Sequence, residues 1–126
     1  MIVLDTCALL WLAGDQSMLS EQTLARLEEE PIVAVSAISA FEIALKWFGR
    51  KLELPVPPHE WWDGVVAHHH LEVLPVDAHV AIRATELPPI HRDPADRFII
   101  ATAKEHGAPV VTSDERFGEY DVEIMR

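Results

Sequence analysis

Short apolar runs alternate with amphipathic segments of helical period along this chain, and this alternation restricts the fold more than any other feature. The apolar runs have the length of buried strands and occupy residues 1–5, 32–36, 71–76, 108–113 and 121–125. The helical segments occupy residues 6–14, 20–30, 37–51, 59–70, 77–87 and 94–107, while 114–120 form a turn or short helix. Such alternation favours right-handed crossovers and a mostly parallel sheet with helices on both faces. We therefore predict an α/β fold, a three-layer α/β/α sandwich.

The size and composition of the chain are those of one ordinary globular unit. Its 126 residues predict a single domain over residues 1–126. Cys7 is the only cysteine, so an internal disulfide is excluded, which fits a reducing cytosol. No apolar run approaches the roughly 18 residues of a membrane span. We therefore expect a cytoplasmic protein without a membrane partner.

The charge of the chain needs an explanation. A formal net charge of −11 argues against a general nucleic-acid binder, which usually presents a basic surface. Solubility is the simplest account of so many acidic residues. The alternative is that some of them are concentrated in one site that needs a cation, or that the acidic surface meets a basic partner. The positions of the acids must decide.

Two aspartates follow predicted strands directly. Asp5 ends the first apolar run, and Asp114 follows the run "VVTS". The carboxyl ends of parallel strands are where sites form in such sheets. A helix cap at Asp5 and a turn at Asp114 are the structural alternatives.

Glu42 lies on a predicted helix beside an apolar stripe. The stripe follows i, i+3, i+4 spacing and consists of Ile38, Phe41, Leu45 and Phe48. Because Glu42 falls within this stripe, we expect it on the core-facing side, where a carboxylate is costly unless it is paired or bound to metal. An ordinary ion pair with Lys46, one turn further on, is the alternative.

The stretch "HRDPADRFII", residues 91–100, holds two more aspartates. Asp93 before a proline has the position of a helix N-cap. Asp96 then stands in the first turn, where acids favour the helix dipole, but it also shares a face with Ile99 and Ile100. Capping therefore suffices for Asp93, whereas the buried direction of Asp96 favours a site.

These acids converge at one edge of the predicted sheet. Two carboxylates about 4 Å apart repel by roughly 4 kcal/mol at an effective dielectric of about 20. Such a cluster needs protonation or a divalent cation, and carboxylate oxygens without cysteine ligands suit Mg²⁺ or Mn²⁺. A cation held in this way serves phosphodiester hydrolysis, the chemistry of a metal-dependent nuclease.

Four stretches of the sequence resemble the PIN domain family, and more narrowly the VapC-type toxin ribonucleases of bacterial and archaeal toxin–antitoxin pairs. They are "IVLDTCALLW", "SAISAFEIALKWFGRKLELP", "HRDPADRFIIATA" and "VVTSDERF", and they occur in the family's order. The resemblance covers essentially the whole chain and implies a PIN-like fold. It places the family's catalytic, metal-binding quartet on Asp5, Glu42, Asp96 and Asp114.

The same resemblance implies roles for neighbouring residues. Thr6 and Thr112 match hydroxyl positions that hold carboxylates or a metal-bound water. Asp93 belongs to the "DPADR" pattern. Its first role is to cap the helix, and its second is to act near the metal. The implied reaction is Mg²⁺- or Mn²⁺-dependent cleavage of RNA by an endoribonuclease, which forms a homodimer and is blocked by a cognate, VapB-like antitoxin. Which carboxylate is the general base stays open, as does the number of metal ions.

Basic residues next to the acidic motifs are candidates for contacts with RNA phosphates. Arg97 and Arg116 flank two of the aspartates, and Lys46 follows Glu42 by one turn. Solvated helix ends and local ion pairs are the alternative for all three.

Two other functions compete with a ribonuclease toxin. A receiver-like, Mg²⁺-binding regulatory module also gathers acids at strand ends, but it would need paired acids after the first strand and a lysine after a late strand. Asp5 stands alone, and "VVTSDERF" has no lysine. A non-catalytic module that kept a PIN-like fold is the second alternative, and the intact quartet argues against it.

Overall fold

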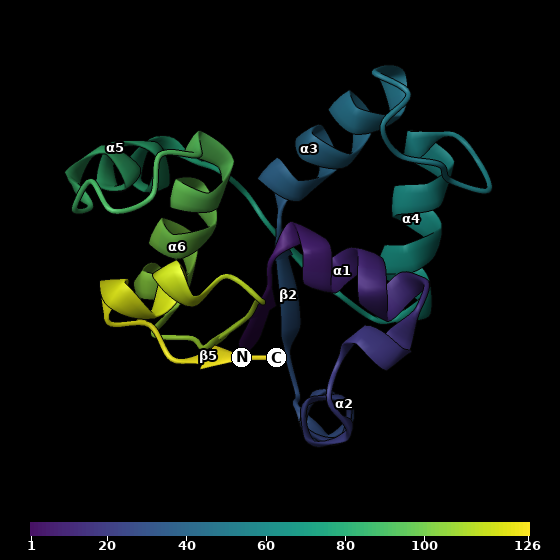
Figure 1. Ribbon diagram of the computed structural model, residues 1–126, viewed down its shortest axis with the longest axis horizontal. Coiled ribbons are helices and arrows are strands. Elements are labelled where there is room, and N and C mark those ends of the chain that lie inside the picture. The colour runs from purple at the N-terminus through teal and green to yellow at the C-terminus, as the bar shows by residue number, and fades with distance from the viewer.

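The computed structural model of the protein describes residues 1–126 and has a five-stranded, fully parallel sheet at its centre (Figure 1). The strands are β1 (Ile2–Leu4), β2 (Val33–Ser36), β3 (Glu72–Leu74), β4 (Val110–Val111) and β5 (Ile124–Met125). Their order across the sheet is β3-β2-β1-β4-β5, with β1 in the middle. In register, Leu4 lies between Val35 and Val111, so the chain leaves these central strands at the same edge.

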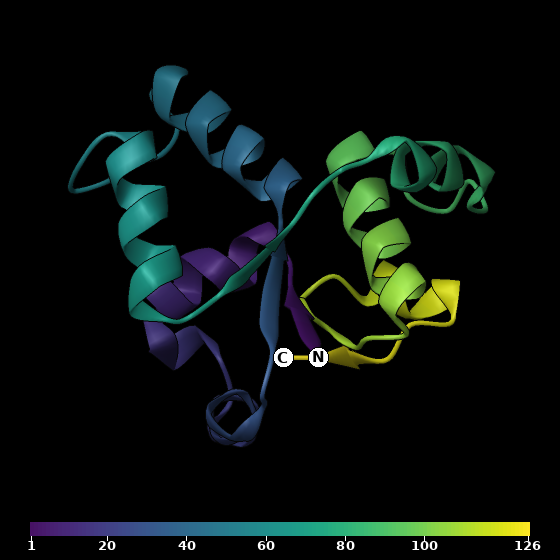
Figure 2. The same ribbon diagram turned by 180° about the vertical axis from the view of Figure 1, so that it is seen from behind.

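Helices cover both faces of the sheet, which confirms the three-layer α/β/α prediction. One layer holds α1 (Thr6–Ala13), α2 (Glu21–Glu29), α3 (Ala37–Phe48) and α4 (Pro58–His68). The other holds α5 (Ala78–Glu86), α6 (Pro94–His106) and the 3₁₀ helix η2 (Glu115–Tyr120); a second 3₁₀ turn, η1, spans Gln16–Met18. The segment after α4, which includes β3, crosses from the first layer to the second (Figure 2). No helix has both the length and the apolar character needed to cross a membrane.

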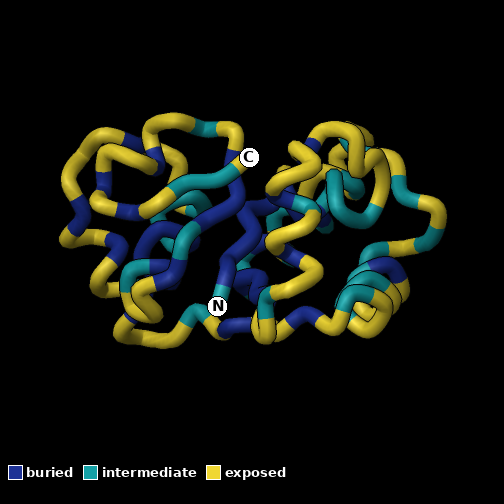
Figure 3. The backbone as a smooth tube through the Cα atoms, turned by 90° about the horizontal axis from the view of Figure 1, so that it is seen from below, coloured by how far each residue is buried: buried dark blue, intermediate teal, exposed yellow.

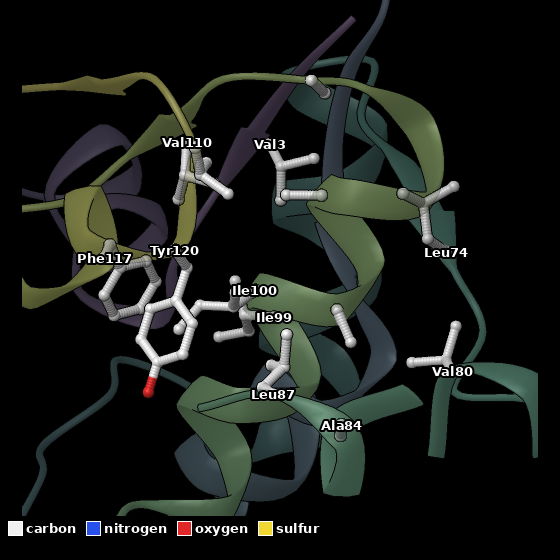
Figure 4. Close-up of a cluster of buried hydrophobic side chains, with 14 of the residues drawn as sticks. Val3, Leu74, Val80, Ala84, Leu87, Ile99, Ile100, Val110, Phe117 and Tyr120 are labelled. Carbon is white, nitrogen blue, oxygen red and sulfur yellow. The ribbon is translucent and has the colours of Figure 1, made fainter. Parts of the chain in front are cut away.

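Each face of the sheet has its own apolar core. Val3 and Val110 point to the α5–α6 side, where they pack with Ile99, Ile100 and Phe117 (Figure 4). The opposite core contains, among others, Ile2, Leu4, Leu9, Val35, Ile43 and Trp61. Alternate residues of β1 thus face alternate cores, as the period of two in a strand requires. Buried residues run through the middle of the molecule, where β1, β2 and β4 are buried throughout, while the outer loops are mostly exposed (Figure 3).

The predicted helix starts are confirmed at three caps. The side chain of Ser20 accepts a hydrogen bond from Thr23 N at 3.0 Å and begins α2. Ser36 accepts from Ile38 N at 3.1 Å and begins α3. These side chains satisfy N–H groups that have no partner inside the helix. The third cap, Asp93, begins α6 and belongs to the site.

The predicted burial of the apolar stripe on α3 is wrong for three of its four residues. The exposed fractions are 60% for Phe41, 59% for Leu45 and 73% for Phe48. The side of α3 that is buried in the chain carries Ser39 and Ile43 instead. Periodicity identifies an apolar face, but it does not say whether the same chain covers that face.

Two glycines give opposite predictions for the same substitution. Gly107 ends α6 with a left-handed backbone, φ 59°, and Gly64 lies inside α4; a Cβ at either position would meet no atom within 4 Å. We expect Gly107→Ala to lower the free energy of unfolding by about 1 kcal/mol, because the left-handed region penalises a Cβ. Gly64→Ala should raise it by roughly 0.5–1 kcal/mol, because alanine favours the helix. Urea denaturation of both variants checks the pair, and equal signs would contradict it.

Candidate active site

Asp5 lies at the central point of the carboxyl edge of the sheet. It follows β1 directly, is 6% exposed, and its Oδ1 accepts the Ala8 N–H at 2.8 Å, so it also caps α1. Burial raises the pKa of this carboxyl, while the Thr112 hydroxyl and the Ala8 N–H partly oppose the rise. The cap that the sequence offers as an alternative to a site is therefore real, and it holds the carboxylate at the strand end.

Glu42 reaches the same edge from α3, supported by hydroxyl groups. The Thr6 hydroxyl donates to Glu42 Oε1 at 2.5 Å and lies 2.8 Å from the Ser39 hydroxyl. Glu42 forms no ion pair with Lys46, which is exposed. Glu42 is partly buried, but for a different reason from the one predicted: it lies about 100° around the helix from Phe41 and faces α1.

Asp96 enters the site from the first turn of α6. Asp93 caps this helix by accepting the Ala95 N–H at 2.9 Å, and Asp93 itself is exposed. Ile99 and Ile100 are fully buried, so the face that Asp96 shares with them points inward as predicted. Burial, followed by the charge of Asp93, raises the pKa of Asp96 to about 7.

Asp114 follows β4 and has the opposite electrostatic environment. Arg116 donates to it through its backbone N–H and through Nε and Nη2, at 3.0, 2.9 and 2.7 Å. These bonds, together with one from His91, lower the pKa of Asp114 to about 2. Thr112 fixes the turn, because its Oγ1 accepts the Asp114 N–H at 3.0 Å.

The structure brings the four predicted carboxylates to one edge, but not equally close together. The charges of Glu42 and Asp114 raise the pKa of Asp5, and those of Glu42 and Asp5 raise the pKa of Asp96. The tightest group of possible metal-ligating atoms comes from His91, Asp96 and Asp114, whose atoms lie within 4.8 Å of one another.

His91 belongs to the site, although the sequence did not predict it there. Its Nε2 lies 2.9 Å from Asp114 Oδ2 and 3.0 Å from Asp96 Oδ2, and the residue is only 4% exposed. A histidine in an irregular stretch before a helix has no periodicity that would show its direction. The one local indication of a role in the site is that His91 stands two residues before Asp93, the capping aspartate.

Arg97 has a different place from the one predicted. Its guanidinium donates to four backbone carbonyl oxygens at 2.7–3.0 Å, those of Ala84, Leu87, Pro88 and His91. These bonds tie the end of α5 and the following loop to α6. Because the guanidinium is engaged in them, Arg97 is not a candidate for RNA phosphates. Arg116 and Lys46 are exposed beside the acids and keep that role as a prediction.

The donor set fits a hard divalent cation. Carboxylate oxygens without thiolates are the ligands that Mg²⁺ and Mn²⁺ prefer. Burial is the largest cause of the raised pKa of Asp96, and the charges of Asp93, Glu42 and Asp5 add to it, so a bound cation would stabilise the charged form of this carboxyl. Asp5, Asp96 and Asp114, with Glu42 beside them, are the residues that would hold the ion.

The raised pKa of Asp96 predicts how stability depends on pH. Since the folded protein binds this proton more tightly than the unfolded chain, ionising Asp96 destabilises the metal-free protein as pH rises from about 4 to 7. We expect Asp96→Asn to raise the free energy of unfolding by roughly 1–3 kcal/mol at pH 8, with the gain vanishing near pH 4. Denaturation in a chelator across this pH range measures it.

The exposed Asp63 of α4 provides the control for this prediction. Asp63→Asn removes the same charge from the chain without touching the site, so it should leave stability nearly unchanged at every pH. A gain at Asp96 that is independent of pH, or an equal gain at Asp63, would contradict the electrostatic explanation.

Comparison with known proteins assigns the chain to a family. Residues 2–123 match the PIN domain. The chain is 34% identical to ribonuclease VapC22 of Mycobacterium tuberculosis over 116 residues, 91% of this chain and 88% of the relative. FitAcB of Neisseria gonorrhoeae is 27% identical, with a TM-score of 0.68 over 100% of this chain and 97% of the other. VapBC2 from Rickettsia felis, bound to promoter DNA, is 17% identical and shares the fold, with a TM-score of 0.72 over 98% and 97%. The chain belongs to the PIN domain family.

Proposed function

We propose that the protein is an Mg²⁺- or Mn²⁺-dependent endoribonuclease, the toxin of a toxin–antitoxin pair, which works in the cytoplasm and is blocked by a cognate antitoxin. The observation that carries the proposal is the meeting of Asp96 and Asp114 at the carboxyl edge, with Asp5 and Glu42 near enough to shift their neighbours' pKa values. The identity with a ribonuclease over most of the chain supports RNA as the substrate.

The chain's own groups divide the work of hydrolysis. A divalent cation supplies electrostatic stabilisation of the negative charge that develops on the phosphate. Asp5, Asp96 and Asp114 are the residues that would hold this cation. Glu42 has Oε1 engaged with Thr6, so Oε2 is the oxygen left to orient the attacking water or to join the cation. The water oxygen bonds to phosphorus and releases one proton to solvent, the bond to the leaving sugar oxygen breaks, and that oxygen takes up a proton from solvent.

Arg116 and Lys46 contribute positive charge at the mouth of an acidic site. Both are exposed, and Arg116 lies against Asp114 with its side chain 55% exposed. A chain with net charge −11 repels RNA at long range, so contacts to phosphate need local cations. Arg116 is well placed to exchange part of its pairing with Asp114 for an RNA phosphate once a cation neutralises the carboxylate.

Two apolar surfaces of α3 suit the proposed partners. A groove of about 390 Å³ between α3 and α4 is lined mainly by apolar residues, among them Ala44, Trp47 and Trp62. We assign this groove to the antitoxin, which the names of the VapBC relatives support. The exposed face of Phe41, Leu45 and Phe48 adjoins this groove and shares Phe48 with it, and we assign that face to a homodimer.

Cleavage of RNA tests the proposed function. We expect the wild-type protein to cleave single-stranded RNA only with Mg²⁺ or Mn²⁺, and Asp96→Asn to lower the rate at least 100-fold by weakening cation binding. Asp93→Asn should reduce the rate far less, because asparagine also caps helices and Asp93 is exposed. Initial rates with defined oligonucleotides at matched folded fractions provide the measurement.

Metal-independent cleavage that is equal in all three proteins would contradict this mechanism. If Asp93→Asn were the more damaging change, the division between cap and ligand would be wrong. Binding of Mg²⁺ without any cleavage of RNA would favour the non-catalytic or receiver-like module instead.

The oligomeric state tests the assignment of the α3 face. We expect the wild-type chain to be a dimer by light scattering, and the double variant Phe41→Glu with Phe48→Glu to be a monomer, because two charges would be buried without partners. Ile32→Glu places a charge on another exposed apolar residue, at the opposite edge of the sheet, and should leave the dimer intact. A dimer that survives the double change would place the interface elsewhere.

A further inference from the structure

His91 has all of its hydrogen-bonding groups engaged, although it belongs to an irregular stretch. Its backbone N–H donates to the Tyr120 hydroxyl at 2.6 Å, and its carbonyl oxygen accepts from Arg97 Nη1 at 3.0 Å. In the ring, Nδ1 accepts the Asp93 N–H at 3.1 Å, and Nε2 faces Asp114 at 2.9 Å. A buried ring fixed through both nitrogens and both backbone groups has one orientation available to it.

These contacts determine which ring nitrogen carries the proton. A backbone N–H always donates, so Nδ1 must offer its lone pair to Asp93 and carries no hydrogen. The proton of the neutral ring is therefore on Nε2, which donates to Asp114 Oδ2. Asp96 Oδ2, at 3.0 Å, lies beside the same N–H group.

The same tautomer excludes His91 as a metal ligand. A ring nitrogen binds a metal through its lone pair, and Nε2 has none while it carries the proton. Moving the proton to Nδ1 would turn it against the Asp93 N–H, two donors facing each other. The short distances from Nε2 to both carboxylates therefore reflect an N–H group that donates to Asp114 with Asp96 beside it, and not a third metal ligand.

We propose that His91 is a positioning residue: its Nε2–H holds Asp114 Oδ2 beside Asp96 Oδ2 and thereby sets the spacing of two carboxylates that bind the cation. This inference rests on the metal site of the proposed function. Without a donor between them, two carboxylates at this separation repel and rotate apart. With the donor, their remaining oxygens stay directed toward a common ion, as hydrogen bonds behind metal ligands generally ensure.

Several contacts around His91 hold its ring in place. Arg97 joins the carbonyls of Ala84, Leu87 and Pro88 to that of His91, and so fixes the end of α5 and the loop. The Tyr120 hydroxyl donates to Pro88 O at 2.9 Å while it accepts from His91. The ring packs edge-to-face on Phe117, with centroids 5.9 Å apart. The arginine assigned to phosphate by the sequence thus serves the site through His91.

Two substitutions at His91 separate the donor from the bulk of the ring. Glutamine carries an amide nitrogen the same number of bonds from Cα as Nε2, whereas phenylalanine fills the space without a donor. At one fixed pH we expect His91→Phe to weaken Mn²⁺ binding to the full chain about 10- to 100-fold by calorimetry. His91→Gln should remain within about threefold of the wild type, since it restores the N–H group.

A change on α6, the helix that follows His91, controls for a loss of stability. Thr102 is buried in α6, and its hydroxyl bonds only to Phe98 O. Thr102→Ala should lower the melting temperature of the protein without changing the affinity for Mn²⁺. An equal loss of affinity in Thr102→Ala would mean that His91→Phe acts through stability alone, and the positioning role would fall.

Electron spin echo modulation of bound Mn²⁺ reports on directly coordinated nitrogen. We expect no such ¹⁴N coupling in the wild-type protein, because the ligands are oxygens. A strong coupling that disappears in His91→Phe would make His91 a ligand and overturn the proposal, as would wild-type affinity in His91→Phe. If the wild-type chain binds neither Mn²⁺ nor Mg²⁺, the proposed function itself fails, and the role of His91 fails with it.

Discussion

Repulsion between carboxylates at one edge of a parallel sheet is the constraint to which the rest of this structure responds. Each acid but one has its own compensating donor: the Ala8 N–H for Asp5, Thr6 for Glu42, and Arg116 with His91 for Asp114. Asp96 lies 3.0 Å from the same His91 Nε2, but burial, followed by the charge of Asp93, raises its pKa to about 7. A divalent cation at this edge would stabilise the charged form of these carboxylates.

The parallel sheet makes this gathering possible. Three helices, α1, α3 and α6, begin at the carboxyl edge, and their first turns carry residues of the site or their partners. Helix N-termini favour negative charge, and Asp5 shows that one residue can cap a helix and belong to the site. The alternatives weighed for Asp5, a cap or a site, are therefore compatible, because the cap holds the backbone while the second carboxylate oxygen stays available.

Packing within the chain does not explain the exposed apolar residues of α3. Phe41, Leu45 and Phe48 would cost little to replace if the chain acted alone, since they lie in solvent. A contiguous apolar face beside an apolar groove is expected where a second protein binds. The acidic site and these surfaces meet on α3, because Glu42 lies on the same helix as both.

Much of this protein is determined by sequence alone. Strand and helix alternation predicts the three layers and the starts of α2, α3 and α6, and helical phase separates Asp96 from the cap Asp93. All of these depend on neighbours within a few residues. Tertiary structure alone decided that the α3 stripe is uncovered, that Arg97 binds carbonyls, and that His91 sits between two aspartates. His91 and Asp114 are 23 residues apart and come from different elements. Their contact depends on how a loop folds back over the sheet edge. Neither the spacing of apolar residues nor local propensity predicts the course of that loop.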